Sequence, residues 1–210
     1  MASVVRDRMV VSILGVEFFA RPTLTVAREL LGQHLVCEVA GQRLSGLIVE
    51  TEAYIGQEDS ACHCSKGRTS RTEVMFGPPA RTYVYLIYGM YHMLNLVTES
   101  EGFPAAVLIR AVEPLDGLES MQSRRPHVSR TIDLTNGPGK LCQAFGIDSN
   151  LHNWNVSLGQ RLWLEPGNPP PAATVASGPR IGIAYARPED QAAPWRFWLR
   201  DNVFVSKVAR

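Results

Sequence analysis

The chain has 210 residues, of which 45% are hydrophobic and 20% are charged, and its formal net charge is +1. These values are typical of a soluble globular protein and exclude a disordered, collagen-like or coiled-coil chain. The length predicts a single domain over residues 1–210. The balanced charge excludes a strongly basic nucleic-acid coat, although it allows a local basic face.

Sequence patterns predict a mixed α/β fold, in which strands often follow one another directly. Threonines near its start and a glycine at its end predict a helix from Pro22 to Gly32. Pro114 opens a second predicted helix that continues to Arg124, and a third covers Lys140 to Phe145. The proline-rich stretch 166–179 predicts a surface loop. Strand-like segments run from His34 to Val39, Leu44 to Ile55, Arg81 to Tyr88, His92 to Val97, Pro104 to Val112, Arg161 to Leu164, Arg180 to Ala184 and Trp195 to Leu199. We therefore expect a single α/β (mixed α+β) domain with a mostly antiparallel sheet and flanking helices.

The N-terminal segment predicts neither a secretion signal nor a membrane span. Charged residues in MASVVRDRM precede the first apolar run, and Glu17 interrupts that run. A signal peptide has a different pattern, and no run approaches the ~18 apolar residues of a transmembrane helix. We expect a cytoplasmic protein without membrane contact, in which residues 1–10 form a flexible N-terminus.

The four cysteines, at positions 37, 62, 64 and 142, include no Cys-x-x-Cys pair. In a reducing compartment we expect all of them to be free thiols. Cys62, His63 and Cys64 resemble a cluster of metal ligands, but no second ligand pair follows them, so the pattern is weak evidence for a metal. We expect no metal site.

Charge is unevenly distributed along the first half of the chain. The segment 46–60 has four acidic residues and no basic one, whereas the segment 61–81 has four basic residues and one acidic one. An acidic strand beside basic loops suits an enzyme that acts on a polyanion. Solvated charged faces would give the same pattern, so charge alone does not decide between these interpretations.

Three side chains in VETEAY point to chemistry. Alternate residues of a strand share a face, so Glu50, Glu52 and Tyr54 are expected to point the same way. Two carboxylates are unfavourable to bury without partners. The face is therefore either exposed, or it lines a cleft in which one carboxylate is a general base and Tyr54 is a stacking platform. We expect Glu50 to be structural.

Five of the six tyrosines lie between positions 54 and 91. Tyr83 and Tyr85 share a strand face, and they could form a cross-strand aromatic ladder. Tyr88 instead precedes Gly89 at a predicted turn, where an exposed aromatic tip needs a reason. Proteins that bend DNA or flip bases insert such wedges between base pairs.

In combination, these segments resemble the alkyladenine (3-methyladenine) DNA glycosylase family. The resemblance runs from about Gly15 to Val208 and rests on VETEAY at 49–54, His63, YVYLIYGMYHMLN at 83–95, VLIRAVEP at 107–114 and GPGKLCQAF at 137–145. It implies a curved sheet with a protruding β-hairpin at the DNA face, and a single DNA glycosylase domain.

The resemblance implies a catalytic group. Glu52 matches the carboxylate that deprotonates the attacking water. Arg110 matches the arginine that helps to hold this water and the carboxylate, and the main-chain carbonyl of Ile181 matches a third water contact.

The resemblance also implies a base pocket and a DNA-contacting surface. Tyr54 and Tyr85 match the aromatics on either side of the flipped base, His63 matches its edge contact, and Asn95 matches the side chain that disfavours guanine. The DNA contacts that it implies are an intercalating Tyr88 with Met90 beside it, and phosphate contacts from Lys140 and Arg68.

The implied function is a bacterial-type DNA repair enzyme that flips damaged purines such as 3-methyladenine out of double-stranded DNA and hydrolyses the N-glycosidic bond, leaving an abasic site. No lysine lies near the Glu52 strand in the sequence, so we expect a monofunctional hydrolase without Schiff-base chemistry. The resemblance further implies a monomer without metal or organic cofactor, located in the cytoplasm at the nucleoid.

Two alternatives come from other classes of protein. A similar sheet could serve as a non-catalytic nucleic-acid binding module, against which Glu52 and Arg110 argue because a binder needs no buried acid facing its anionic ligand. A metal-dependent nuclease that uses Glu50, Glu52 and Asp59 would lose its activity to chelators. The sequence departs from the family at Cys62 and Cys64, where smaller or hydroxylated residues are expected beside the histidine.

Overall fold

A computed structural model describes residues 12–206, so the N-terminus predicted to be flexible (1–10) lies outside the described residues. The strands are β1 (His34–Val39), β2 (Gln42–Ile55), β3 (Thr82–Ile87), β4 (Tyr91–Val97), β5 (Ala105–Asp116), β6 (Leu162–Glu165), β7 (Val175–Gly178) and β8 (Arg196–Leu199). The α-helices are α1 (Val16–Phe19), α2 (Thr23–Glu29), α3 (Leu118–Arg124), α4 (Pro138–Phe145) and α5 (Pro188–Ala192). Six 3-10 turns join them within this range, and those used below are η1 (His63–Lys66) and η2 (Glu73–Phe76).

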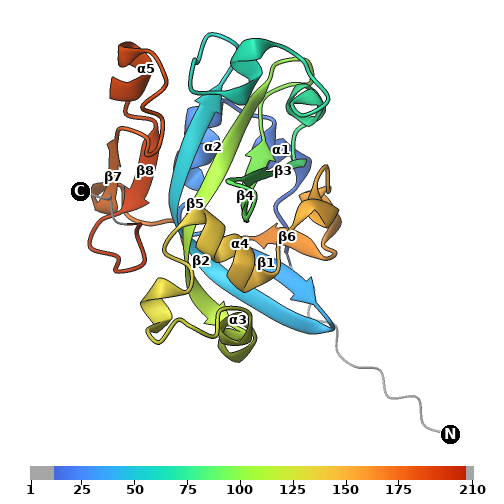
Figure 1. Ribbon diagram of the computed structural model, residues 1–210, viewed down its shortest axis with the longest axis vertical. Helices are drawn as coiled ribbons and strands as arrows, with labels where there is room; N and C mark the ends of the chain where they lie inside the picture. Colours follow the sequence, from blue (N-terminus) through green and yellow to red (C-terminus); the bar gives the residue numbers. More distant parts are fainter. Residues whose placement is uncertain (1–11, 207–210) are drawn as a thin grey trace, which may run out of the picture.

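The eight strands form one antiparallel sheet. Six of them follow the order β3-β4-β5-β2-β1-β6, and β8 and β7 lie off this path. The long strand β2 bonds β5 along one edge, and its other edge pairs first with β1 and then with β8, which in turn pairs with β7. Figure 1 shows α2 behind the strands and α5, β7 and β8 grouped at one side of β2. The predicted fold class, a mixed α/β single domain with a curved antiparallel sheet, is confirmed.

One face of the sheet is covered by helices and holds the main core. Val26 and Ala27 from α2, and Leu30 directly after it, are fully buried against it, and Thr51 of β2 donates a 2.7 Å hydrogen bond to the carbonyl of Ala27. Glu50 and Glu52, the neighbours of Thr51 in β2, alternate to the other face, which is free to carry polar chemistry. Within residues 12–206 no helix has both the length and the apolar character needed to span a membrane.

Most predicted helices and strands begin and end within one or two residues of the observed bounds. Two predictions near prolines and glycines are wrong. Pro114 does not open a helix: it pairs with Gly46 as β5 continues to Asp116, and α3 begins only after Gly117, which has φ 79°. The pairing is irregular between Ser45 and Gly46, and a proline is tolerated at such a bulge because a ladder hydrogen bond is already missing.

The predicted strand from Arg180 to Ala184 is also wrong. This segment is irregular, because Gly182 takes φ 80° and the N–H of Ile181 bonds a carboxylate instead of a neighbouring strand. The strand that pairs with β8 is β7, which lies inside the segment 166–179 predicted as a loop. The sequence pattern therefore predicted β8 but missed β7.

Candidate functional site

A cavity of about 850 Å³ opens on the face of the sheet opposite α2. Its wall combines β2, the β3-β4 hairpin, the segment 60–72 and the irregular segment 181–185. Within it lie most of the residues singled out in the sequence, namely Tyr54, His63, Tyr85, Tyr88, Asn95, Arg110 and Ile181. Lys66, Arg71 and Tyr185 line it as well. Lys66 was not predicted as an amine near the site, because η1 brings it there from outside the β2 strand.

Glu52 is fully buried directly behind this wall. Its Oε2 accepts a 2.8 Å hydrogen bond from the Tyr54 hydroxyl and lies 3.2 Å from a guanidinium nitrogen of Arg110. Its Oε1 accepts a 2.7 Å hydrogen bond from the N–H of Ile181. All three partners line the cavity, so the carboxylate is held at its inner end. The predicted role of Ile181 concerns its carbonyl; the hydrogen bond from its N–H to Glu52 was not predicted.

Arg110 reaches both carboxylates because of a break in strand register. Glu50 pairs with Ala111 and Thr51 pairs with Ile109, so Arg110 has no partner of its own in the ladder. A β-bulge of this kind redirects a side chain and is common near active sites. The guanidinium of Arg110 lies 3.1 Å from Glu50 and 3.2 Å from Glu52.

Glu50 is the centre of a buried ionic network behind Arg110. It also pairs with Arg196 at 2.6 Å, and it accepts hydrogen bonds from the backbone N–H of Ser206 at 2.7 Å and from its hydroxyl at 2.8 Å. Arg110 in turn lies 3.4 Å from the Ser206 hydroxyl. The prediction that Glu50 is structural agrees with this arrangement, because Glu50 is fully buried and faces only these partners.

Two buried charges fix the segment that carries Ile181. Arg180 and Asp59 form a pair whose side chains have no exposed area, with nitrogen–oxygen distances of 2.6 and 2.8 Å. The guanidinium of Arg180 also contacts two aromatic rings, lying 4.8 Å from the centroid of Tyr54 and 4.9 Å from that of Trp195. It also donates to the carbonyl of Ala53 at 2.9 Å, which ties the segment to β2.

The aromatic side of the cavity comes from β3 and η1. Tyr83 and Tyr85 share one face of β3 as predicted, with ring centroids 5.2 Å apart. His63 meets Tyr85 edge-on at 4.7 Å, and its Nδ1 is 2.9 Å from the Tyr83 hydroxyl. Burial and the nearby cations of Arg71 and Lys66 lower the pKa of His63 to about 4. The imidazole is therefore neutral at physiological pH.

Two further groups have fixed protonation or orientation at the cavity. Burial, together with the charge of Glu52, raises the pKa of Tyr54 well above its usual value, so its hydroxyl stays protonated and donates to Glu52. Asn95 is buried on β4, opposite Tyr83 in the ladder, and its amide nitrogen donates to the Tyr83 carbonyl at 3.0 Å.

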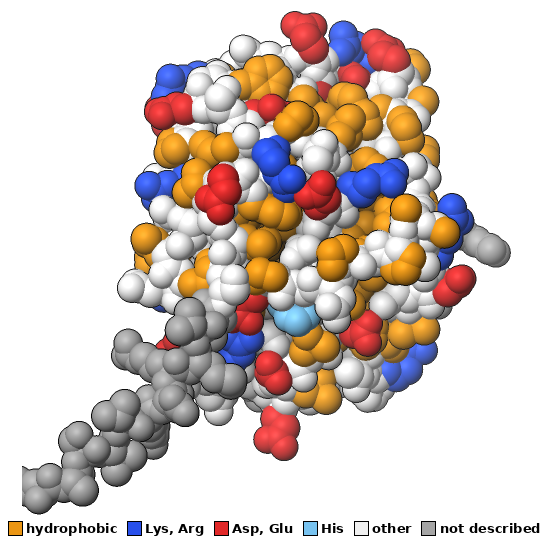
Figure 2. Space-filling view, turned by 180° about the vertical axis from the view of Figure 1, so that it is seen from behind, with side chains coloured by type: hydrophobic (Ala, Val, Ile, Leu, Met, Phe, Trp, Pro, Cys, Tyr) orange, Lys and Arg blue, Asp and Glu red, His pale blue; other side chains and the backbone are white. Residues whose placement is uncertain are grey.

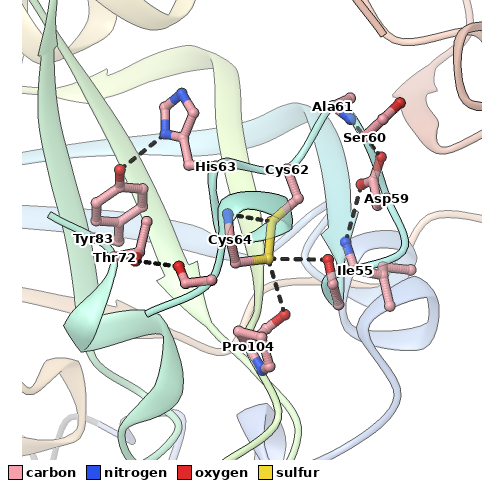
Figure 3. The surroundings of a disulfide bond; sticks show 12 residues. Ile55, Asp59, Ser60, Ala61, Cys62, His63, Cys64, Thr72, Tyr83 and Pro104 are labelled. Atoms are coloured by element: carbon pink, nitrogen blue, oxygen red, sulfur yellow. Dashed lines mark hydrogen bonds between the residues drawn. A yellow bond between two sulfur atoms is a disulfide. The ribbon is translucent and has the colours of Figure 1, made fainter. Parts of the chain in front are cut away.

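The prediction of free thiols is wrong for Cys62 and Cys64, the two neighbours of His63 in the sequence, which form a disulfide with each other (Figure 3). The turn that starts η1 brings their Cα atoms to 5.2 Å, within the range that a disulfide requires. Spacing alone gave no signal for this pairing. Cys37 and Cys142 are free thiols as expected; both are buried, and burial raises the pKa of each to about 12.

The tip of the β3-β4 hairpin is the most exposed aromatic feature of the site. Tyr88 and Gly89 both have positive φ, at 53° and 68°, and the N–H of Met90 donates to the carbonyl of Ile87. Tyr88 is 81% exposed and Met90 is 65% exposed. A left-handed conformation costs a tyrosine about 1–2 kcal/mol relative to glycine. An exposed and strained tyrosine beside a cavity points to a function.

The two residues expected to contact phosphate differ in their surroundings. Lys140, in the first turn of α4, donates to the amide oxygen of Asn136 at 2.7 Å and has no acid within ion-pair distance in the described chain. Arg68 is exposed but already makes a two-point pair with Glu73 at 2.6 and 2.8 Å. Neither residue lines the cavity. On the face seen from behind the view of Figure 1, acidic and basic side chains are interspersed, without a continuous basic area (Figure 2).

The arrangement could deprotonate a small nucleophile beside a stacked planar ligand. A buried carboxylate, a guanidinium and a backbone N–H meet at the end of a cavity whose wall includes the rings of Tyr54 and Tyr85. Residues 12–206 contain no group of three or more His, Cys, Asp and Glu side chains arranged to hold a metal ion. Most of the candidate residues named from the sequence line the cavity, but the supporting residues Arg180, Arg196 and Ser206 were not predicted, because they carry no local motif.

Comparison with known proteins gives a consistent picture. Residues 17–203 match the model of a family described as methylpurine-DNA glycosylase (MPG). A protein from Methanocella arvoryzae is 51% identical over 94% of this chain and 97% of its own length. One from Myxococcus xanthus is 54% identical over 90% and 91%, and one from Alkaliphilus oremlandii is 47% identical over 91% and 97%. Each of these three carries the name "Putative 3-methyladenine DNA glycosylase".

Proposed function

The chain belongs to the methylpurine-DNA glycosylase family, and from this premise we propose that it removes alkylated and deaminated purines, such as 3-methyladenine, from double-stranded DNA. Family membership supports a DNA glycosylase, a hydrolase with DNA as its substrate. The observation that carries the proposal is the buried Glu52, which contacts the wall of a cavity lined by Tyr54 and Tyr85.

In the proposed reaction, Glu52 takes a proton from water while the water oxygen bonds to C1′ of the deoxyribose. The C1′–N bond breaks and its electron pair leaves with the base. The negative charge of Glu52 also stabilises the cationic character that the sugar acquires, and general-base help alone accounts for about 10²–10⁴-fold in rate. Arg110 and the N–H of Ile181 keep the carboxylate aimed at the cavity. The carbonyl of Ile181 is proposed as a further contact for the water.

Base recognition rests on stacking. We assign Tyr54 and Tyr85 to the two sides of the extruded base, because base–aromatic stacking contributes about 1–3 kcal/mol and accepts many purines. A neutral His63 at the edge can offer either a donor or an acceptor. Asn95 lies deeper, where the 2-amino group of guanine would crowd it, which supports its proposed role in rejecting guanine.

We assign Tyr88, with Met90 beside it, to the gap that the extruded base leaves in the duplex. Replacing Tyr88 by Ala is expected to slow the release of a base paired inside a duplex more than that of a base already extruded at a mismatch, because the wedge acts on extrusion. Single-turnover rates on the two duplexes measure the difference. Equal losses on both substrates would contradict the wedge role.

Phosphate contacts predict a steep dependence of DNA affinity on salt, with log K falling by about 0.9 per contact for each unit of log salt concentration. Lys140→Gln should reduce this slope by about one contact. Arg68→Gln should change it less, because Arg68 must first leave Glu73. Titrations between about 50 and 200 mM salt test both variants, and a flat response in the wild type would rule out the phosphate assignments.

The direct test of the proposed function is base release under single-turnover conditions with EDTA present. Duplexes that carry one hypoxanthine or one ethenoadenine, and separately methylated DNA, are incubated with the protein and then treated with alkali. Breaks that appear only after alkali indicate a metal-free monofunctional glycosylase. Breaks without alkali would indicate lyase chemistry, for which Lys66 in the cavity wall is the first residue to replace. Binding without release would indicate a non-catalytic module.

A further inference from the structure

Arg110 is shared between two buried carboxylates and holds neither of them at the shortest distance. Its Nε lies 3.1 Å from Glu50, and its Nη1 lies 3.2 Å from Glu52. A charge-assisted bond between nitrogen and oxygen is usually about 2.7–2.9 Å long, so either carboxylate could draw the guanidinium closer. The balance between these two contacts therefore decides how firmly Arg110 holds the carboxylate proposed as the general base.

Arg196 supplies Glu50 with a second cation. Its backbone lies opposite Glu52 in the pairing of β2 with β8, but its side chain runs diagonally to Glu50. Its Nε is 2.6 Å from the same Oε1 atom that Arg110 contacts, and its Nη2 donates to the carbonyl of Ser206 at 3.3 Å. In the described chain, no other cation lies within 4.0 Å of the Glu50 carboxylate.

Neutral donors do not favour one carboxylate over the other. Glu52 accepts from the hydroxyl of Tyr54 at 2.8 Å and from the N–H of Ile181 at 2.7 Å. Glu50 accepts from the hydroxyl of Ser206 at 2.8 Å and from its N–H at 2.7 Å. Each acid thus has one hydroxyl and one backbone N–H at matching distances. The difference between them lies in their cations.

The charges of this buried cluster cancel, because it consists of two carboxylates and two guanidiniums. Without Arg196, two carboxylates would compete for one guanidinium. An uncompensated buried charge is strongly unfavourable, and the deficit would arise at Glu50. Arg110 would therefore move toward Glu50, and its contact with Glu52 would lengthen.

We propose that Arg196 is a positioning residue for the proposed reaction: it neutralises Glu50 and thereby leaves the guanidinium of Arg110 to Glu52. The inference rests on the proposed function and adds a residue that acts through its neighbours. Arg196 is buried and does not line the cavity, so it contacts neither the base nor the water. Because its action is a matter of charge, a second substitution that removes the competing charge should restore activity. A merely structural role predicts that a second substitution in the same cluster lowers activity further.

The test measures the single-turnover rate of base release and the dissociation constant on one duplex. The substrate is the one that the wild type cleaves fastest among hypoxanthine, ethenoadenine and methylated DNA. Arg196→Met removes the charge, Arg196→Lys keeps a cation, and Arg196→Met combined with Glu50→Gln also removes the competing carboxylate. Circular dichroism gives the folded fraction of each variant, and rates are compared per folded molecule.

Arg28→Met is the matched control for the loss of an arginine beside β8. Arg28 is exposed, and its guanidinium lies 5.4 Å from the ring centroid of Phe197 in β8. It has no acid within ion-pair distance in the part of the chain that the structure describes. This variant should release bases at the wild-type rate.

Arg196→Met should lower the rate of release by about 10- to 100-fold, because displacing a catalytic arrangement by about 1 Å has an effect of this size. The dissociation constant should stay the same, because a buried side chain does not meet a phosphate. The double variant should be faster than Arg196→Met, and Arg196→Lys should lie between Arg196→Met and the wild type. If Arg196→Met does not fold, release by a folded double variant at close to the wild-type rate supports the inference.

Three results would overturn the inference while leaving the glycosylase intact. The first is a wild-type rate in Arg196→Met. The second is a double variant that is no faster than Arg196→Met or, where the single variant does not fold, one that is itself unfolded or inactive. The third is a loss in Arg196→Met that comes entirely from weaker DNA binding. No release of any base by the wild type would instead defeat the proposed function.

Discussion

Glu52→Gln should lower the single-turnover rate of base release by at least about 10³-fold on every substrate. General-base catalysis contributes about 10²–10⁴-fold, and the variant also removes the negative charge that faces the developing cation of the sugar. Glutamine keeps the size of the side chain; its amide oxygen can still accept the hydrogen bond from the N–H of Ile181, and its amide nitrogen can donate to the hydroxyl oxygen of Tyr54. Folding and DNA binding should therefore survive, and quenched-flow or gel assays with alkali would measure the loss.

The matched control is Glu58→Gln, which removes a carboxylate from an exposed position six residues further along the chain. It should release bases at the wild-type rate. Retention of more than about a tenth of the activity by Glu52→Gln would be incompatible with a general base and would move the assignment to another acid.

The second large effect concerns stability. Arg180→Met should reduce the free energy of unfolding by about 3–5 kcal/mol, because it leaves the carboxylate of Asp59 buried without a counter-charge. The variant also loses the hydrogen bond to the carbonyl of Ala53 and the contacts of the guanidinium with the rings of Tyr54 and Trp195. Equilibrium unfolding in urea measures the change.

Two further variants separate charge burial from simple loss of an ion pair. Arg68→Met breaks the pair with Glu73, whose side chains are 58% and 59% exposed, and it should leave the unfolding midpoint nearly unchanged. The double variant Arg180→Met with Asp59→Asn should recover part of the loss, because no uncompensated charge remains. A double variant that is less stable than Arg180→Met alone would show that the carboxylate has enough other partners.

The amino-acid sequence predicted the elements whose residue pattern is local and strong. The strand His34–Val39 was predicted with its observed bounds, and the tyrosine hairpin within one residue at each end. The misplaced elements depend on partners far along the chain. Ile181 leaves the strand conformation because Glu52, from β2, accepts its N–H, and no pattern within the segment records that bond.

The candidate site divides in the same way. Tyr54, Tyr85, Asn95 and Arg110 could be proposed because they lie in recognisable segments, and the structure brings them to one cavity. The break in register that aims Arg110 at two carboxylates could not be predicted, because it requires the pairing of β2 with β5. The disulfide beside His63 could not be predicted either, because a Cys-x-Cys spacing does not fix the backbone turn that brings the two Cα atoms close enough.

The bonds between Glu50 and Ser206 also constrain how the protein is made. The two residues are 156 positions apart, so the support behind Arg110 forms only when nearly the whole described chain is available. Contacts of such long sequence separation form late and slow folding, because the intervening chain must first lose its freedom. During translation, β2 and β5 can pair before Ser206 leaves the ribosome. A nascent chain that stops short of this serine would lack the two hydrogen bonds that hold Glu50 behind its arginine, so we expect the complete site only after residue 206 has emerged.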